Sequence, residues 1–172
     1  GTEYFVNFWV TTTEPEILIP VGHEIASEQF RLPIEPLTVA EHKASGKTNV
    51  TTEGDEVKVS SSKMQFVFNK KSGLVTSYKV NGTEYFTEGF GIQPNFWRGP
   101  NDNDYGNGQP KREQIWKQSS KNFKVADVIT EADGNNTVLT ANYLLAAGNL
   151  YIVKYTIYPD GVVHADITFT ST

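Results

Sequence analysis

The chain has 172 residues, no cysteine, and 15 basic against 20 acidic side chains, which gives a formal net charge of −5. The missing cysteine excludes disulfides, thiol catalysis and thiolate metal sites, and a negative chain without a basic run argues against nucleic acid or an anionic membrane surface as a partner. No apolar run approaches the ~18–20 residues that span a bilayer. With 10 Phe and 8 Tyr, and with Thr and Val common, the composition predicts an all-β fold.

The N-terminal region predicts two strands. Residues 4–12 are apolar on both faces, as in a strand that is covered on both sides. After a proline-containing loop, residues 23–32 form the second predicted strand, and the polar residues that follow are typical of a linker. We expect residues 1–36 to be the end of one sandwich domain and residues 37–56 to be a linker, in a chain cut from a longer protein.

From residue 57 onward the pattern becomes regular. Asn81-Gly82 is a strong hairpin signal, because both central positions of a type I′ turn need a positive φ. Short strands separated by such turns build the layers of an antiparallel sandwich, and we assign residues 57–172 to such a sandwich. The predicted strands cover residues 57–61, 64–69, 74–80, 83–86, 123–131, 137–145, 150–158 and 162–170.

The segment from residue 87 to residue 120 interrupts this rhythm with many glycines and prolines. It contains one predicted helix, over residues 112–118, with Ile115 and Trp116 facing inward. A loop this long inside a compact domain is usually functional or disordered. Its many aromatic residues argue against disorder.

The densest group of chemically capable residues runs from Asn95 to Gly106 and reads Asn-Phe-Trp-Arg-Gly-Pro-Asn-Asp-Asn-Asp-Tyr-Gly. Amides and carboxylates can pair with sugar hydroxyls, and aromatic rings can stack on the apolar faces of sugars. The same residues also suit a structured loop in which Asn and Asp cap their own turns. Composition alone favours this second interpretation.

This run resembles the Phe-x-Arg-Ala-Pro-x-Asp-Asn-Asp-x-Gly signature of family 2 β-galactosidases, with Gly99 where Ala is usual. The signature lies near the start of their C-terminal domain. Residues 68–74 are similar to a hairpin of that domain, and residues 22–26 resemble the end of the immunoglobulin-like domain before it. The resemblance covers nearly the whole chain.

The resemblance implies a large retaining glycoside hydrolase that acts on terminal β-galactosides. Its two catalytic Glu lie in a TIM barrel, followed by an immunoglobulin-like domain and a C-terminal sandwich of the galactose-mutarotase-like type. Residues 1–36 would then end the immunoglobulin-like domain, and residues 57–172 would begin the sandwich. The chain would carry no catalytic residue and no cofactor, and its partners would be the rest of the enzyme and, through it, the galactoside. The compartment, cytoplasmic or periplasmic, stays open.

In the family, the residues just after the Asp-Asn-Asp run border the mouth of the active site, and these correspond here to residues 106–110. This resemblance makes five residues candidates for the substrate entrance. A guanidinium beside carboxylates can lock a loop through ion pairs, so we assign Arg98 and Asp102 a structural role in the loop. The entrance candidates are Asn103, Asp104, Gly106, Asn107 and Gly108.

No metal site is predicted. With Asp102 at position 1 of a calcium loop, Gly106 and Asn107 occupy positions that require a ligand and a glycine. The histidines are scattered and lack metal-ligand spacing. Two other functions remain open: a stand-alone carbohydrate-binding module, with a platform of rings such as Trp97, Tyr105 and Trp116, and a sandwich that binds a protein partner.

Overall fold

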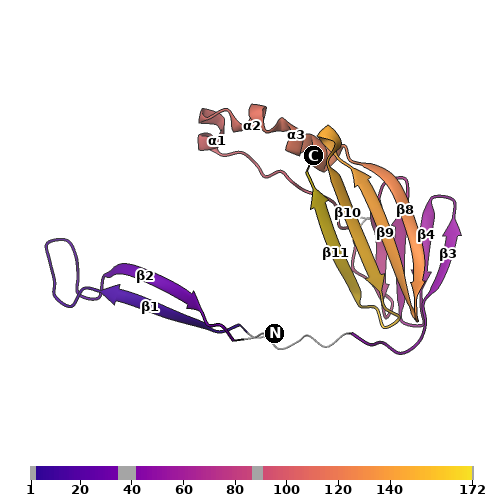
Figure 1. The fold of residues 1–172 in the computed structure, drawn as a ribbon, viewed down its shortest axis with the longest axis horizontal. Coiled ribbons are helices and arrows are strands. Elements are labelled where there is room, and N and C mark those ends of the chain that lie inside the picture. Colours follow the sequence, from indigo (N-terminus) through magenta and orange to yellow (C-terminus); the bar gives the residue numbers. More distant parts are fainter. Residues whose placement is uncertain (1–2, 35–41, 87–90, 172) are drawn as a thin grey trace. The chain divides into compact units, whose positions relative to one another are not determined.

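The computed structural model describes residues 3–34, 42–86 and 91–171. The chain divides into two compact units, Gly1–Lys43 and Ala44–Thr172 (Figure 1). Each unit is described separately below. In the described residues, no helix is long and apolar enough to cross a membrane.

The first unit is an antiparallel hairpin of β1 (Phe5–Thr11) and β2 (Glu24–Arg31), which confirms both predicted strands. Phe8 and Phe30 make an edge-to-face ring contact on one side of this hairpin, with centroids 5.8 Å apart. The expected cover on both faces is not seen among the described residues, where Phe8 and Trp9 are more than half exposed. A two-stranded hairpin buries too little apolar surface to be stable by itself.

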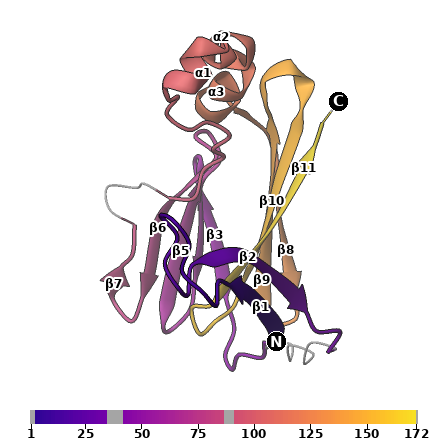
Figure 2. The ribbon, with the colours of Figure 1, turned by 90° about the vertical axis from the view of Figure 1, so that its left-hand side faces the viewer.

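The second unit contains two antiparallel sheets, as predicted. One sheet has the order β3-β4-β5-β6-β7 and the other has the order β11-β10-β9-β8 (Figure 2). The first sheet consists of β3 (Asn49–Glu53), β4 (Glu56–Ser60), β5 (Met64–Asn69), β6 (Leu74–Val80) and β7 (Thr83–Glu84). The second consists of β8 (Lys124–Asp133), β9 (Asn136–Leu144), β10 (Leu150–Ile157) and β11 (Val163–Thr170).

Every predicted strand is present within two residues of its predicted bounds, and β3 is an addition. This strand lies within residues 37–56, where a linker was expected. All of its side chains are exposed, because it lies at the edge of its sheet and pairs only with β4. A strand that buries neither face shows no alternation of apolar residues, so its sequence resembles a polar linker.

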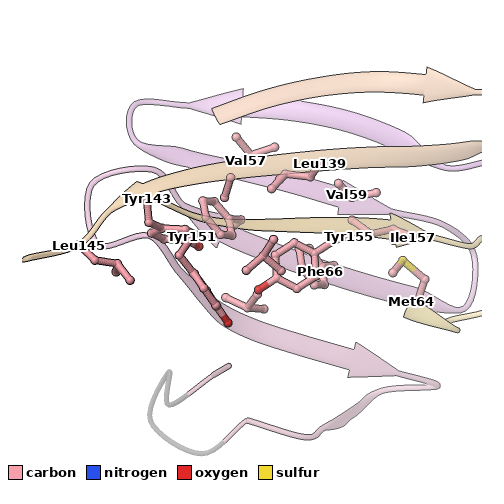
Figure 3. Packing of buried hydrophobic residues seen from close by; sticks show 14 residues of the cluster. Val57, Val59, Met64, Phe66, Leu139, Tyr143, Leu145, Tyr151, Tyr155 and Ile157 are labelled. Atoms are coloured by element: carbon pink, nitrogen blue, oxygen red, sulfur yellow. The ribbon is translucent and has the colours of Figure 1, made fainter. Parts of the chain in front are cut away.

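The hydrophobic core lies between the two sheets (Figure 3). The predicted alternation in β10 is confirmed, since Tyr151, Val153, Tyr155 and Ile157 are all buried. Burial of each large apolar side chain contributes about 1.5–3 kcal/mol. Facing residues of the other sheet include Val57, Val59, Met64, Phe66, Phe68 and Val75.

Hydrogen bonds also join the two sheets. The Tyr143 hydroxyl on β9 donates to the carbonyl oxygen of Gly73, in the turn between β5 and β6, at 2.7 Å. Burial raises the pKa of Tyr143, so this hydroxyl keeps its proton and its role as donor. The Tyr78 hydroxyl on β6 donates in the same way to the carbonyl oxygen of Gly161. These bonds fix the sheets relative to each other at two separate points.

The segment that was predicted to hold one helix contains three short ones: α1 (Asp102–Gly106), α2 (Gln109–Arg112) and α3 (Gln114–Lys121). They lie together beyond one end of the two sheets (Figures 1 and 2). Trp116 is half-buried, as expected, but Ile115 is exposed, so the predicted inward orientation of Ile115 is wrong. The helix covers the sheet end with only part of its surface.

Candidate functional site

The site begins at the N-terminus of α1, where Asn101 is the N-cap residue. The Asn101 side chain accepts a hydrogen bond from the Asp104 N–H at 3.0 Å, and the Asp104 carboxylate accepts one from the Asn101 N–H at 2.8 Å. This reciprocal pair is a capping box, which satisfies two N–H groups that a helix start leaves unpaired. It explains why a helix forms where the sequence had predicted only a loop.

Arg98 closes the other side of the Asp104 carboxylate. Its two terminal nitrogens donate to the two carboxylate oxygens at 2.6 and 2.9 Å, in a bidentate fork. The Arg98 hydrogen bonds, with the bond from the Asn101 N–H, hold the pKa of Asp104 below its ordinary value. Asp104 is buried, whereas the Arg98 side chain is 65% exposed, so water screens the charge attraction and the fork mainly fixes geometry.

Asp102 and Asn103 lie on the exposed side of α1. Arg98 pairs with Asp104, and in the described part of the chain Asp102 makes no ion pair with it. Asp102 instead adds a negative charge to the first turn of α1, where the helix dipole favours one. The Asn103 backbone oxygen accepts a hydrogen bond from the Asn107 N–H. The Asn103 side chain itself is exposed.

Gly106, Asn107 and Gly108 form the connection between α1 and α2. Gly108 has a φ of 73°, in the left-handed region that favours glycine, whereas Gly106 is helical. The Asn107 side chain accepts the Gln109 N–H at 2.9 Å, and its backbone oxygen accepts a bond from Arg112 at 2.9 Å. Of the two glycines, Gly108 is the position where a side chain would strain the backbone.

An aromatic cluster attaches this segment to the sandwich. Phe96 contacts Tyr151 of β10, Phe169 of β11 and Trp116 of α3, with ring centroids 5.4–5.9 Å apart. The Ser120 hydroxyl accepts the Phe96 N–H at 2.7 Å and donates to the Trp116 carbonyl oxygen at 3.0 Å. The residues just before Arg98 are therefore anchored to the end of the second sheet.

The three rings considered as a sugar platform have different surroundings. Trp116 packs within the aromatic cluster, Tyr105 is 66% exposed on α1, and Trp97 lines a pocket beside α3. No ring contact joins Trp97 to either of the others in the described residues. A single flat platform of these rings is therefore not formed.

Metal ligands are not gathered at the site or elsewhere in the described ranges, which hold no group of three or more His, Cys, Asp and Glu able to bind an ion. The site groups that can interact with a ligand are the exposed amides of Asn103 and Asn107 and the backbone around Gly108. This arrangement can form hydrogen bonds to a polar ligand while its backbone stays fixed.

Comparison with known proteins places this site within a family. The sequence model described as "Beta galactosidase small chain" matches residues 60–172, which include the Arg98–Asp104 fork and both sheets of the sandwich except β3 and most of β4. The chain belongs to this β-galactosidase small-chain family. The family assignment agrees with the resemblance found in the sequence.

Three curated relatives are β-galactosidases. The protein of Priestia megaterium is 32% identical over 142 residues, which is 81% of this chain and 13% of the relative. The protein of Kluyveromyces lactis is 27% identical over 155 residues, 84% of this chain and 15% of the relative. The protein of Oenococcus oeni is 37% identical over 92 residues, 51% of this chain and 8% of the relative. This member of the small-chain family thus spans a small part of the length of its relatives.

Two features of the site were missed in the sequence. The capping box could have been found, because Asn101 followed three residues later by an acidic side chain is a known helix-start pattern. The pairing of Trp97 with Lys117 could not, because twenty residues separate them and only the packing of α3 brings them together, with the Lys117 Nζ atom 5.9 Å from the ring centroid.

Proposed function

We propose that this chain is a non-catalytic region of a retaining β-galactosidase that hydrolyses terminal β-galactosides. The catalytic Glu pair would lie in a TIM barrel elsewhere in the longer protein. In this proposal residues 1–36 end an immunoglobulin-like domain, and residues 57–172 begin a sandwich of the galactose-mutarotase-like type. The region supports the barrel and forms one wall of the active-site entrance.

The observation that carries the entrance assignment is the bidentate fork between Arg98 and Asp104. A wall that guides substrate needs a fixed backbone, because a mobile loop loses conformational entropy when it becomes ordered on binding. The fork, the capping box and the bonds of Asn107 supply that order without using the side chain of Asn103. Asn103, Gly106, Asn107 and Gly108 are exposed beside this rigid framework.

The test is the variant Asn103→Ala in the complete enzyme. Its side chain makes no hydrogen bond within the described residues, so we expect the melting temperature to stay unchanged. At the entrance, loss of its amide should lower kcat/KM for an aryl β-galactoside about three- to tenfold, the equivalent of about 0.6–1.4 kcal/mol.

The matched control is Gln118→Ala, an exposed amide on α3 outside the proposed wall. This control should keep the kcat/KM of the unmodified enzyme. If Asn103→Ala also keeps it, or if both variants lose activity equally, the assignment of this loop to the entrance is wrong.

The same proposal predicts that the chain alone hydrolyses no aryl β-galactoside, because retaining hydrolysis needs two carboxylates about 5–5.5 Å apart, one as acid/base and one as nucleophile. The measurement is release of the aryl alcohol by the purified chain against a buffer blank. Turnover that persists after a second purification would contradict the non-catalytic role.

A further inference from the structure

The pocket beside α3 that Trp97 lines is separate from the exposed face of Asn103. It has a volume of about 520 Å³, within the range of ~300–1,000 Å³ that is usual for small-ligand pockets. The pocket is lined by the chain from Gly91 to Trp97 on one side and by α3 on the other. The proposed entrance role does not involve this pocket.

The charge of the pocket is opposite to that of the chain. The whole sequence carries a net charge of −5, yet the described residues that line the pocket include Lys117 and Lys121 and no Asp or Glu. These lysines are four residues apart on α3, so their side chains lie on the same face of the helix. Two ammonium groups at one pocket favour a ligand that carries a negative charge.

Trp97 gives the pocket a flat apolar wall. Its indole lines the pocket and is half-buried, and the Lys117 Nζ atom lies 5.9 Å from the ring centroid. A cation over a ring keeps both groups in place, which leaves the ammonium of Lys117 next to the apolar wall. An apolar wall beside a positive charge suits a ligand with one flat apolar face and one anionic substituent.

Amide groups complete the lining. The Asn95 side-chain oxygen accepts the Trp97 N–H at 3.0 Å, which leaves the Asn95 NH₂ group as a donor. The Gln93 amide makes no hydrogen bond within the described part of the chain and can both donate and accept. Such groups match the hydroxyls of a sugar, which donate and accept in turn.

We propose that this pocket binds a pyranose that carries a carboxylate, such as a uronic acid residue. The apolar face of the sugar ring stacks on Trp97, the carboxylate lies between Lys117 and Lys121, and the amides of Gln93 and Asn95 bond the hydroxyls. This inference stands on the pocket alone and does not depend on the function proposed above.

The test is calorimetric titration of the full 172-residue chain with galacturonate, galactose and acetate at low salt. Galacturonate should bind saturably, and galactose and acetate should each bind at least tenfold more weakly, because each lacks half of the recognised features. Equal affinity for galactose would show that the lysines recognise nothing, and equal affinity for acetate would show a simple anion site. Either result, or no saturable binding of galacturonate, overturns the proposal.

Variants locate the site. Lys117→Gln and Lys121→Gln should each weaken galacturonate binding about three- to tenfold, and Lys111→Gln should leave it unchanged. Lys111 is exposed on α2 outside the pocket lining, so this control makes the same change in net charge. Equal weakening by all three would reduce the effect to bulk charge and contradict the site.

The aromatic wall has its own pair of variants. Trp97→Phe keeps a ring and should retain most of the affinity for galacturonate. Trp97→Ala should lower that affinity at least tenfold. Dispersed amide resonances in each variant show that the chain is folded. If folded Trp97→Ala binds galacturonate as well as the unmodified chain does, the proposed stacking of the sugar on Trp97 is wrong.

Discussion

The Asp104 carboxylate accepts three hydrogen bonds, two from the Arg98 guanidinium and one from the Asn101 N–H. It therefore connects the chain before α1, the N-cap and the first turn of the helix through one side chain. The Phe96 ring, two residues before Arg98, contacts Tyr151 and Phe169 of the second sheet. The position of α1 relative to the sandwich thus depends on a short chain of contacts.

Removal of the N-cap should loosen α1. We expect Asn101→Ala to lower the stability of α1 by about 1 kcal/mol, because an alanine side chain cannot accept a hydrogen bond from the Asp104 N–H. Hydrogen exchange at the Asp104 and Tyr105 amides measures this cost locally. Asn103→Ala, within the same helix but outside the cap, is the control and should leave the protection of these amides unchanged or increase it. Equal loss of protection in both variants would contradict the capping role.

The pKa of Glu84 should lie far below the ordinary value of a glutamate. The Ser77 hydroxyl, with the N–H groups of Phe86 and Tyr78, lowers its pKa from 4.5 to about 2. The folded pKa lies below the unfolded one, so the stabilisation is complete above pH 4.5 and is lost as the pH falls toward 2. NMR titration of the Glu84 side chain measures the pKa directly.

The same titration in Ser77→Ala tests the cause. Removal of the hydroxyl should raise the pKa of Glu84 toward 4.5, because the Ser77 bond contributes most to the shift. Ser72→Ala removes a hydroxyl from the turn between β5 and β6, which makes no bond to Glu84 among the described residues. This control should leave the pKa of Glu84 low. A low pKa in Ser77→Ala would assign the shift to the backbone bonds instead.

Gly73 should be much less tolerant of alanine than Gly134. Both have a positive φ, 70° and 60°, and this alone costs an alanine about 1 kcal/mol. A Cβ atom at Gly73 would also lie 2.6 Å from the Tyr143 ring and 2.6 Å from Val125, whereas at Gly134 it meets open space.

Overpacking of this kind destabilises a protein by about 1–3 kcal/mol more. Gly73→Ala should therefore lower the free energy of unfolding by about 2–4 kcal/mol, and Gly134→Ala should lower it by about 1 kcal/mol. Denaturant unfolding of both variants under the same conditions gives the two values. Equal losses would mean that the Tyr143 ring shifts freely, in conflict with its bond to the Gly73 carbonyl oxygen.

Ser119→Ala should stabilise the protein. The Ser119 side chain is fully buried on α3, and its hydroxyl has no hydrogen-bond partner within the described residues. A buried unpaired hydroxyl costs about 1–3 kcal/mol, and alanine also favours the helix. We expect a gain of about 1 kcal/mol in the free energy of unfolding. Ser120→Ala on the same helix should do the opposite, because its hydroxyl has two partners. A loss in Ser119→Ala would show that this hydroxyl is bonded.

The sequence by itself determined the strands of both units except β3, and it determined the buried face of β10. Those features follow from alternation with a period of two and from turns such as Asn81-Gly82, where φ is 51° and 83°. Local backbone sterics and the need to bury one face leave few alternatives, so neighbouring residues contain the information. The run from Arg98 to Gly106 likewise carried the family resemblance without any structure.

Only the tertiary structure decided which side chains meet. The edge position of β3 has no sequence pattern, since an exposed strand obeys no periodicity. Arg98 stood near two carboxylates in sequence, and the helix turn selected Asp104 by placing it at the third position after the cap. Trp97 and Lys117 meet because the aromatic cluster holds α3 against the sheet end. Contacts between distant residues depend on how the elements pack, and packing is a property of the whole chain.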